Sequence, residues 1–250
     1  MIRRRRKRRW FTRALEGFIC LGILGGGGYA FYLYMERSAS LLVKTIRVEG
    51  ANVLREEEIL VKSGLSREDN LLLLDTEAVT TNILALPYVK TCRVTRVFPD
   101  TVNIQIEERV AVATLLVHNR MFELDREGVV LRELPAGSPP TGPFISEAPD
   151  LGYVEPGRQL SQRALVAALA VWEAFMTTTM AQEVNVSEIV ALHENNVRMY
   201  CDELPYTVVW GRSNFVEEAR RLDVLWRQVG GELACADYLD LRFDRDLACK

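Results

Sequence analysis

The segment from Gly17 to Met35 most restricts what this chain can fold into. It reads GFICLGILGGGGYAFYLYM and holds no charged residue over nineteen positions, between Glu16 and Glu36. As an α-helix rising about 1.5 Å per residue it would be about 28 Å long, close to the thickness of the hydrocarbon core of a bilayer. We therefore predict a transmembrane helix over residues 17–35.

Residues 1–16, before this segment, are strongly basic and contain one acid, Glu16. Basic runs also occur in nucleic-acid-binding proteins, but an apolar segment directly after the run favours a membrane setting. By the positive-inside rule this tail stays in the cytoplasm, near anionic lipid, and the chain from Glu36 onward is exported. We predict no nucleic-acid partner. The basic residues of the tail are Arg3, Arg4, Arg5, Arg6, Lys7, Arg8, Arg9 and Arg13.

A cleaved export signal is the alternative interpretation of this end. Arg8-Arg9-Trp10-Phe11 resembles a twin-arginine motif, and Ser38-Ala39-Ser40 resembles a small-residue cleavage site. The apolar segment is longer than the usual signal core of about 7 to 15 residues, which favours a retained anchor. Gly22 and Gly26 also have the GxxxG spacing that packs membrane helices together.

The remaining chain has the composition of a folded protein. Of the 250 residues, 48% are apolar and 26% are charged, which is enough apolar material for a buried core. Residues 17–250 hold 23 basic and 33 acidic residues, so this part is acidic although the whole chain has a net charge of only −3. The length favours two modest domains after the anchor.

The first exported block, residues 43–110, predicts a β-α-α-β-β order. Residues 45–49 alternate between apolar and polar, as a half-buried strand does. Helices are expected near 56–62, ended by Gly64, and after a cap at Asp75 or Thr76, ended by Pro87. Strands are expected at 89–98 and 101–107, joined by a Pro99-Asp100 turn. A sheet backed by two helices is a plausible domain of this length.

The second block, residues 111–250, predicts a mainly antiparallel sheet with helices on one side. Helices are expected over 161–180, capped by Ser161, and from Ser213 onward. Strands are expected at 115–118, 121–124, 129–131, 188–194, 196–201 and 206–211, and the segment 134–143 is expected to be a loop. The fold class is therefore α+β after a single transmembrane helix.

No catalytic, metal or cofactor site is predicted. The two histidines, His118 and His193, are far apart, and the sequence contains no G-x-S-x-G, Walker or H-E-x-x-H motif. Cys20 falls within the apolar segment, and the cysteines at 92, 201, 235 and 249 have no metal-ligand spacing. A disulfide among Cys201, Cys235 and Cys249 and buried free thiols both remain open.

The end of the chain, YLDLRFDRDLACK at 238–250, predicts a terminal strand over 238–243. Leu239, Leu241 and Phe243 would share the buried face, and Tyr238, Asp240 and Arg242 the polar face. Such a strand would lie at the rim of its sheet with one open flank, where a partner segment pairs by β-augmentation.

In order along the chain, the basic tail, the apolar segment, IRVEGANVLREEEI, LPYVKTCRVTRVFPDTVNIQIEERVAVA, FELDREGVV and YLDLRF resemble the bacterial cell-division family FtsQ/DivIB. The first exported block resembles the polypeptide-transport-associated (POTRA) domain of that family. At the junction, Glu108 to Ala113 lacks the proline that the family usually has, and the tail after Leu247 is shorter than family tails.

The resemblance implies a non-enzymatic protein of the inner membrane at the division septum. It implies a partner pair of the FtsB/FtsL type and further divisome contacts through the POTRA domain and the membrane helix. A POTRA-containing component of outer-membrane assembly or secretion and a twin-arginine-exported binding protein are the alternatives. By the resemblance, the partner-binding residues are Tyr238, Arg242, Phe243, Asp244 and Arg245.

Overall fold

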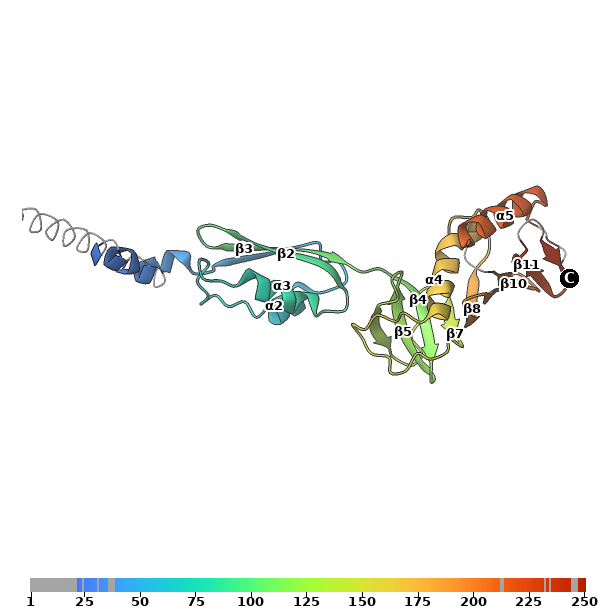
Figure 1. The fold of residues 1–250 in the computed structure, drawn as a ribbon, viewed down its shortest axis with the longest axis horizontal. Coiled ribbons are helices and arrows are strands. Elements are labelled where there is room, and N and C mark those ends of the chain that lie inside the picture. Colours follow the sequence, from blue (N-terminus) through green and yellow to red (C-terminus); the bar gives the residue numbers. More distant parts are fainter. Residues whose placement is uncertain are drawn as a thin grey trace, which may run out of the picture. The chain divides into compact units, whose positions relative to one another are not determined.

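The structure is a computed structural model that describes residues 22–23, 25–30, 32–35, 39–211, 214–231, 233, 235–243 and 247–250 (Figure 1). Predictions on the basic tail and on Gly17, Cys20, Ser213, Asp244 and Arg245 lie outside these residues. The chain divides into two compact units. The first comprises residues 1–83 and 92–106, and the second comprises residues 84–91 and 107–250.

The predicted membrane segment is described only in part. Residues 22–23, 25–30 and 32–35 are helical, so Met35, at the predicted end of the span, lies in a helix. Among the helices that the structure describes, none combines the length and the apolar character needed to cross a bilayer. A short 3-10 helix, η1 (Ala39–Leu41), follows.

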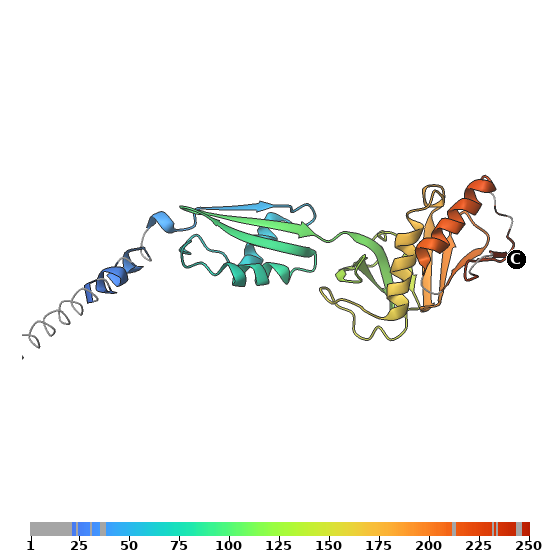
Figure 2. The same ribbon diagram turned by 45° about the horizontal axis from the view of Figure 1, so that its top comes forward.

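The first unit contains the predicted β-α-α-β-β order. Its sheet has the order β1-β3-β2, with β1 parallel to β3 and Ile46 opposite Val102. Figures 1 and 2 show both helices on one face of this sheet. The elements are β1 (Thr45–Glu49), α2 (Glu56–Ser63), α3 (Thr76–Leu84), β2 (Val89–Val97) and β3 (Thr101–Glu108).

Local signals in the sequence explain where these elements begin and end. Gly64 adopts a φ of 72° directly after α2, a conformation that ends helices and favours glycine. The Asp75 carboxylate accepts the backbone N–H groups of Glu77 and Ala78 and so caps α3. The alternation in β3 places Val102 and Ile104 in the core, both fully buried.

The second unit is built on a nine-stranded sheet of order β12-β11-β10-β9-β8-β7-β4-β5-β6. The pairs β10–β11, β4–β7 and β7–β8 are parallel, and the others are antiparallel, so the sheet is mainly antiparallel as predicted. Its strands are β4 (Ala111–Val117), β5 (Arg120–Asp125), β6 (Val130–Leu134), β7 (Phe144–Ser146), β8 (Val186–His193), β9 (Asn196–Cys201), β10 (Thr207–Trp210), β11 (Tyr238–Asp240) and β12 (Ala248–Cys249).

Two helices, α4 (Arg163–Phe175) and α5 (Phe215–Gln228), lie along one face of this sheet (Figure 2). Phe175 of α4 meets Trp210 of β10 edge to face, with ring centroids 6.5 Å apart. Ala219 and Leu222 of α5 are fully buried in the same core. The apolar stripes of both helices therefore face the sheet, as their spacing predicts.

The predicted bounds of α4 were wrong. The helix begins at Arg163 after Gln162, and neither Ser161 nor Gln162 caps it with a side-chain bond. It ends near Phe175 because the Thr177 and Thr178 hydroxyls donate to the carbonyls of Ala174 and Phe175. A 3-10 helix, η2 (Met180–Gln182), follows. The loop predicted at 134–143 was confirmed, apart from Leu134, which ends β6. The strand β7, which follows this loop and enters the middle of the sheet, was not predicted, because its three residues are too few to show a period.

Candidate partner-binding site

The C-terminal rim of the nine-stranded sheet carries the residues predicted to bind a partner. The predicted strand over 238–243 is formed only as β11, which ends at Asp240. β10 pairs with one side of β11 in parallel, and β12 pairs with the other side antiparallel. The prediction of an open flank on this strand was therefore wrong. β12 has only two residues, too few for the sequence to reveal a strand that folds back on β11.

The outer edge at this end of the sheet belongs to β12, in the part of the chain that the structure describes. Tyr238 and Lys250 exchange both backbone hydrogen bonds, with N···O distances of 3.1 and 3.4 Å. In an antiparallel ladder the residue next to such a pair points its N–H and C=O away from the partner strand. Cys249 therefore directs one backbone donor and one acceptor outward.

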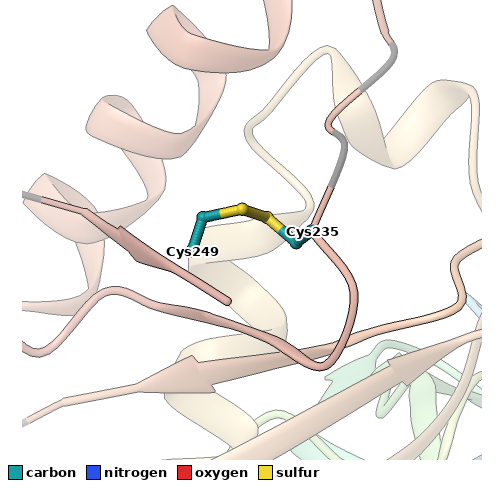
Figure 3. The surroundings of a disulfide bond; sticks show 2 residues. All are labelled: Cys235 and Cys249. Carbon is teal, nitrogen blue, oxygen red and sulfur yellow. A yellow bond between two sulfur atoms is a disulfide. The ribbon is translucent and has the colours of Figure 1, made fainter.

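A disulfide fixes β12 in this place (Figure 3). It joins Cys249 to Cys235, which is buried and precedes β11. The backbone N–H groups of Ala236 and Asp237 both donate to the Lys250 carbonyl at 2.6 Å. The last residues of the chain are thus held both by a covalent bond and by the backbone.

The sequence left the cysteine pairing open, and the three-dimensional structure decides it. Cys201 is free and buried in the core, and burial raises the pKa of its thiol to about 12, helped by the nearby acids Glu203 and Asp202. Cys92 is also free, and burial raises its pKa as well. Both thiols are therefore less reactive than an exposed cysteine.

Arg242, predicted to bind a partner, is paired within the chain. Its Nε lies 2.9 and 3.0 Å from the two Asp240 carboxylate oxygens, and its Nη2 lies 2.6 Å from one of them. Asp240 was predicted to face outward but is buried. Burial raises the pKa of Asp240. The hydrogen bonds that the Arg242 side chain and backbone donate to it, together with the positive charge of Arg242, outweigh burial, so the pKa of Asp240 lies below its ordinary value.

Tyr238 and Arg242 line one polar hollow of about 410 Å³ on the sheet. Arg198 of β9 also lines it and, unlike Arg242, forms no ion pair with any residue that the structure describes. The Asp237 carboxylate, by contrast, is paired with the Lys250 ammonium group at 3.6 Å. The hollow therefore offers an unpaired cation for an acidic group. The complete lining is Asn196, Arg198, Thr207, Val209, Asp237, Tyr238, Asp240 and Arg242.

Arg221 of α5 holds the chain after β11. Its guanidinium donates to the backbone carbonyls of Leu241, at 2.9 Å, and Phe243. The Phe243 side chain, 52% exposed, is therefore presented at the rim by a restrained backbone. Between α5 and β12 lies an apolar groove of about 490 Å³, lined by Arg220, Arg221, Val224, Leu225, Gln228, Leu233, Leu239, Leu247 and Cys249.

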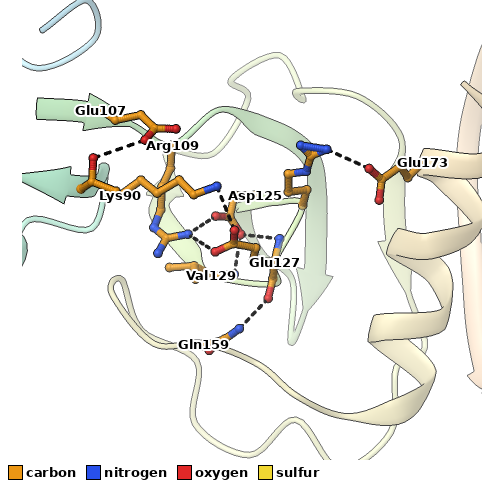
Figure 4. Close-up of polar contacts among 10 residues, drawn as sticks. Lys90, Glu107, Arg109, Asp125, Glu127, Val129, Gln159 and Glu173 are labelled. Carbon is orange, nitrogen blue, oxygen red and sulfur yellow. Dashed lines mark hydrogen bonds and ion pairs between the residues drawn. The ribbon is translucent and has the colours of Figure 1, made fainter. Parts of the chain in front are cut away.

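A separate charged cluster lies near the start of β4 (Figure 4). Arg109 contacts Asp125 at 2.5 Å and Glu127 at 2.8 Å, and Lys90 contacts Glu127 at 2.9 Å. The hydrogen bonds from Arg109 and Lys90 lower the pKa of Glu127 to about 2. A cavity of about 410 Å³ beside the cluster has Leu169, Trp172 and Met176 in its wall. These charges satisfy one another, so the cluster joins segments of the second unit.

Comparison with known proteins gives two family matches. Residues 41–109 match the FtsQ-type POTRA domain, and residues 114–242 match the C-terminal domain of the cell division protein FtsQ/DivIB. Together these two matches cover most of the chain, in the order that the resemblance implied.

Similar proteins named cell division protein FtsQ occur in several bacteria. One from a Geobacter species is 26% identical over 231 residues, which cover 90% of this chain and 81% of the relative. One from an Anaeromyxobacter species is 27% identical over 239 residues, covering 96% and 80%. One from Caulobacter vibrioides is 35% identical over 108 residues, covering 43% and 36%. The chain belongs to the FtsQ/DivIB family of bacterial cell division proteins.

Proposed function

We propose that this FtsQ/DivIB protein is a non-enzymatic scaffold of the divisome with one membrane span. Residues 17–35 cross the inner membrane, and the basic tail, residues 1–16, stays in the cytoplasm. The POTRA domain, residues 43–110, and the β domain, residues 111–250, are exported at the division septum. The uncharged run of nineteen residues and the eight basic residues before it support this topology.

The cytoplasmic tail contacts anionic lipid in this proposal. Each lysine or arginine near such a surface contributes about 1 kcal/mol of attraction, and salt weakens it. This contribution would add to the anchoring that the apolar segment supplies.

The β domain binds an FtsB/FtsL-type coiled-coil pair at its C-terminal rim, and through it helps to recruit and regulate septal peptidoglycan synthesis. One observation carries this proposal: the backbone of Cys249 points outward from the last strand of the sheet. An extended partner segment would continue the ladder there. The side chains proposed to contact the partner are Tyr238, Arg242, Phe243, Asp244 and Arg245, with Arg198 beside them.

Amide hydrogen exchange on the membrane-reconstituted full chain tests the docking edge. On addition of the coiled-coil pair we expect the Cys249 amide to exchange at least ten-fold more slowly, because it gains a backbone acceptor. The Lys250 amide already donates to Tyr238 and should change little. Binding of the pair with no change at Cys249 would place the partner elsewhere.

Export without a retained anchor remains the second candidate, supported by the Arg8-Arg9-Trp10-Phe11 motif. N-terminal sequencing of the mature protein, together with protease protection in intact cells, separates the two. Cleavage near Ser40 would remove the proposed membrane span. An intact N-terminus, with a β domain that external protease digests once the outer envelope is opened, supports the anchored form.

A further inference from the structure

The segment that enters the first unit is bonded on both sides. The Leu71 N–H donates to the Leu41 carbonyl at 2.8 Å, and the Val43 N–H donates to the Asp69 carbonyl at 3.0 Å. On the other side, the Lys44 N–H donates to the Asp100 carbonyl at 2.8 Å. The loop 65–74 and the turn 98–100 between β2 and β3 therefore flank the point where the chain enters β1. Figures 1 and 2 show both at the same end of this unit.

Large apolar side chains are exposed at this end. Leu72 and Leu73 of the loop are 39% and 44% exposed, and Val97 and Phe98 of the β2–β3 hairpin are 49% and 56% exposed. A folded domain usually buries leucine and phenylalanine, and several exposed together indicate a contact surface. We call Leu72, Leu73, Val97 and Phe98 the apolar tip.

The apolar tip has a well-bonded backbone. The Asn70 side chain accepts the Leu72 N–H at 2.9 Å, and the Asn70 carbonyl accepts the Leu73 and Leu74 N–H groups at 3.1 and 2.9 Å. Arg96, which precedes Val97, donates to the Leu74 carbonyl at 2.5 Å and so ties the hairpin to the loop. The loop that carries Leu72 and Leu73 and the hairpin that carries Val97 and Phe98 are thus joined at this end of the unit.

The chain before β1 indicates what this end meets. Met35 is the last residue of the proposed membrane span. The side-chain amide of Asn70 donates to the Met35 backbone carbonyl at 3.1 Å. Asn70 is the residue that organises the loop carrying Leu72 and Leu73. The end of the span and the apolar tip are therefore linked through a single side chain.

From this placement we propose that the apolar tip contacts the bilayer interface on the exported side, next to the membrane helix. Aromatic and aliphatic side chains with a lysine at the edge suit the interfacial region of a membrane. The Lys44 ammonium group lies 3.3 Å from the Asp100 carboxylate, which reduces its attraction to anionic lipid. The contact would be mainly apolar. This inference rests on the proposed membrane topology and needs no partner protein.

Tryptophan quenching tests the contact in the full chain, reconstituted into phosphatidylcholine vesicles that contain lipids brominated near the headgroup. Phe98→Trp places a reporter on the apolar tip. Val53→Trp is the matched control, because Val53 is 60% exposed and follows the opposite end of β1. After subtraction of the signal of the unsubstituted chain, we expect the added emission at position 98 to be quenched at least two-fold more than that at position 53.

Three further measurements decide the outcome. Adding Leu72→Ser and Leu73→Ser to the Phe98→Trp chain should reduce quenching at position 98. Replacing a third of the lipid by phosphatidylglycerol should change the quenching of the Phe98→Trp chain by less than two-fold. If the chain stays embedded after alkaline extraction but both reporters are quenched alike, this inference is wrong and the topology stands. If alkali extracts the chain, the topology and the inference fall together.

Discussion

Cys249, on the last strand, is disulfide-bonded to Cys235, fourteen residues earlier, with their Cα atoms 5.3 Å apart. The bond joins the edge strand β12 to the segment that leads into β11. The edge proposed to receive the partner is thus attached to the fold by a covalent link that the sequence alone did not define.

Removing this link should loosen the docking edge. Cys235→Ser opens a loop for which chain entropy predicts a loss of about 3 kcal/mol, concentrated at the rim because the strand is short. We expect faster exchange of the Lys250 amide and at least ten-fold weaker binding of the FtsB/FtsL-type pair. Reduction of the unsubstituted protein should reproduce both effects. Cys92→Ser, which removes a free cysteine of the first unit, is the control and should leave β12 unchanged.

Arg198 and Arg242 should respond differently to substitution. Arg198→Glu should weaken partner binding about ten-fold or more with a stability change within about 0.5 kcal/mol, because Arg198 has no ion pair among the described residues. Arg242→Ala should also destabilise the rim, by about 1–2 kcal/mol after allowance for solvent, because it leaves buried Asp240 without its partner. Calorimetric binding and denaturant unfolding measure the two effects.

A matched surface variant provides the control for these charge changes. Arg126→Glu alters an exposed arginine, paired with Glu173, in the same unit and should not affect partner binding. Equal loss of binding in the Arg126 and Arg198 variants would indicate a general charge effect and contradict the proposed site. Truncation after Leu239 is a poor test, because it also removes β12 and Cys249.

Glu123 should make the second unit sensitive to acid. Burial raises its pKa, but a hydrogen-bonded pair with Arg132 and the hydroxyls of Tyr88 and Thr141 outweigh this, so the pKa lies below the ordinary 4.5. A lowered pKa stabilises the fold above pH 4.5, and this stability is lost as the pH falls through the folded-state pKa. Glu123→Gln should lower the free energy of unfolding by about 1–2 kcal/mol at pH 7 and flatten its decline below pH 4.5.

Denaturant unfolding of the second unit, followed between pH 7 and pH 3, measures this pH dependence. Glu155→Gln, at an exposed glutamate of the same unit, is the control and should follow the unsubstituted protein. An unchanged pH profile for the Glu123 variant would show that its hydrogen bonds do not favour the charged form.

The POTRA sheet should depend strongly on Gly50. Its φ is +90°, and a Cβ there would lie 2.0 Å from the Ile106 carbonyl oxygen, so alanine is strained and displaces β3. We expect Gly50→Ala to cost about 2 kcal/mol or more, seen as faster amide exchange in β1 and β3. Gly64→Ala is the control, because its φ is +72° but a Cβ there would lie 3.8 Å from Asn82 Nδ2, an ordinary contact distance. Equal effects would show that φ alone, without the close contact, sets the cost.

Much of the fold was predictable because local patterns agree with it. Val102, Ile104 and Ile106 alternate within the strand predicted at 101–107, and all three are buried. Ala219, Leu222 and Trp226 recur at helical spacing in the last predicted helix and are buried in the core of the β domain. Helix ends were found where a side chain or glycine marks them, as at Asp75 and Gly64. They were missed at α4, where threonine hydroxyls end the helix without such a mark.

The candidate site was less predictable because it depends on short segments that meet across the sequence. Tyr238 and Arg242 do share one hollow, but Arg198 joins them only because β9 and β11 flank β10. The same pairing buries Asp240, which the polar pattern had placed outside. No local signal in the sequence records which strands become neighbours.

The sequence by itself determined the family, the two-domain order, the apolar segment with its basic tail, and most helices and strands, because periodicity and composition act over neighbouring residues. Only the tertiary structure decided which backbone forms the rim: β12 covers β11, and Cys235 rather than Cys201 bonds Cys249. The physical reason is that strand pairing and disulfide formation depend on distances between remote residues, and the packing of the whole β domain sets those distances.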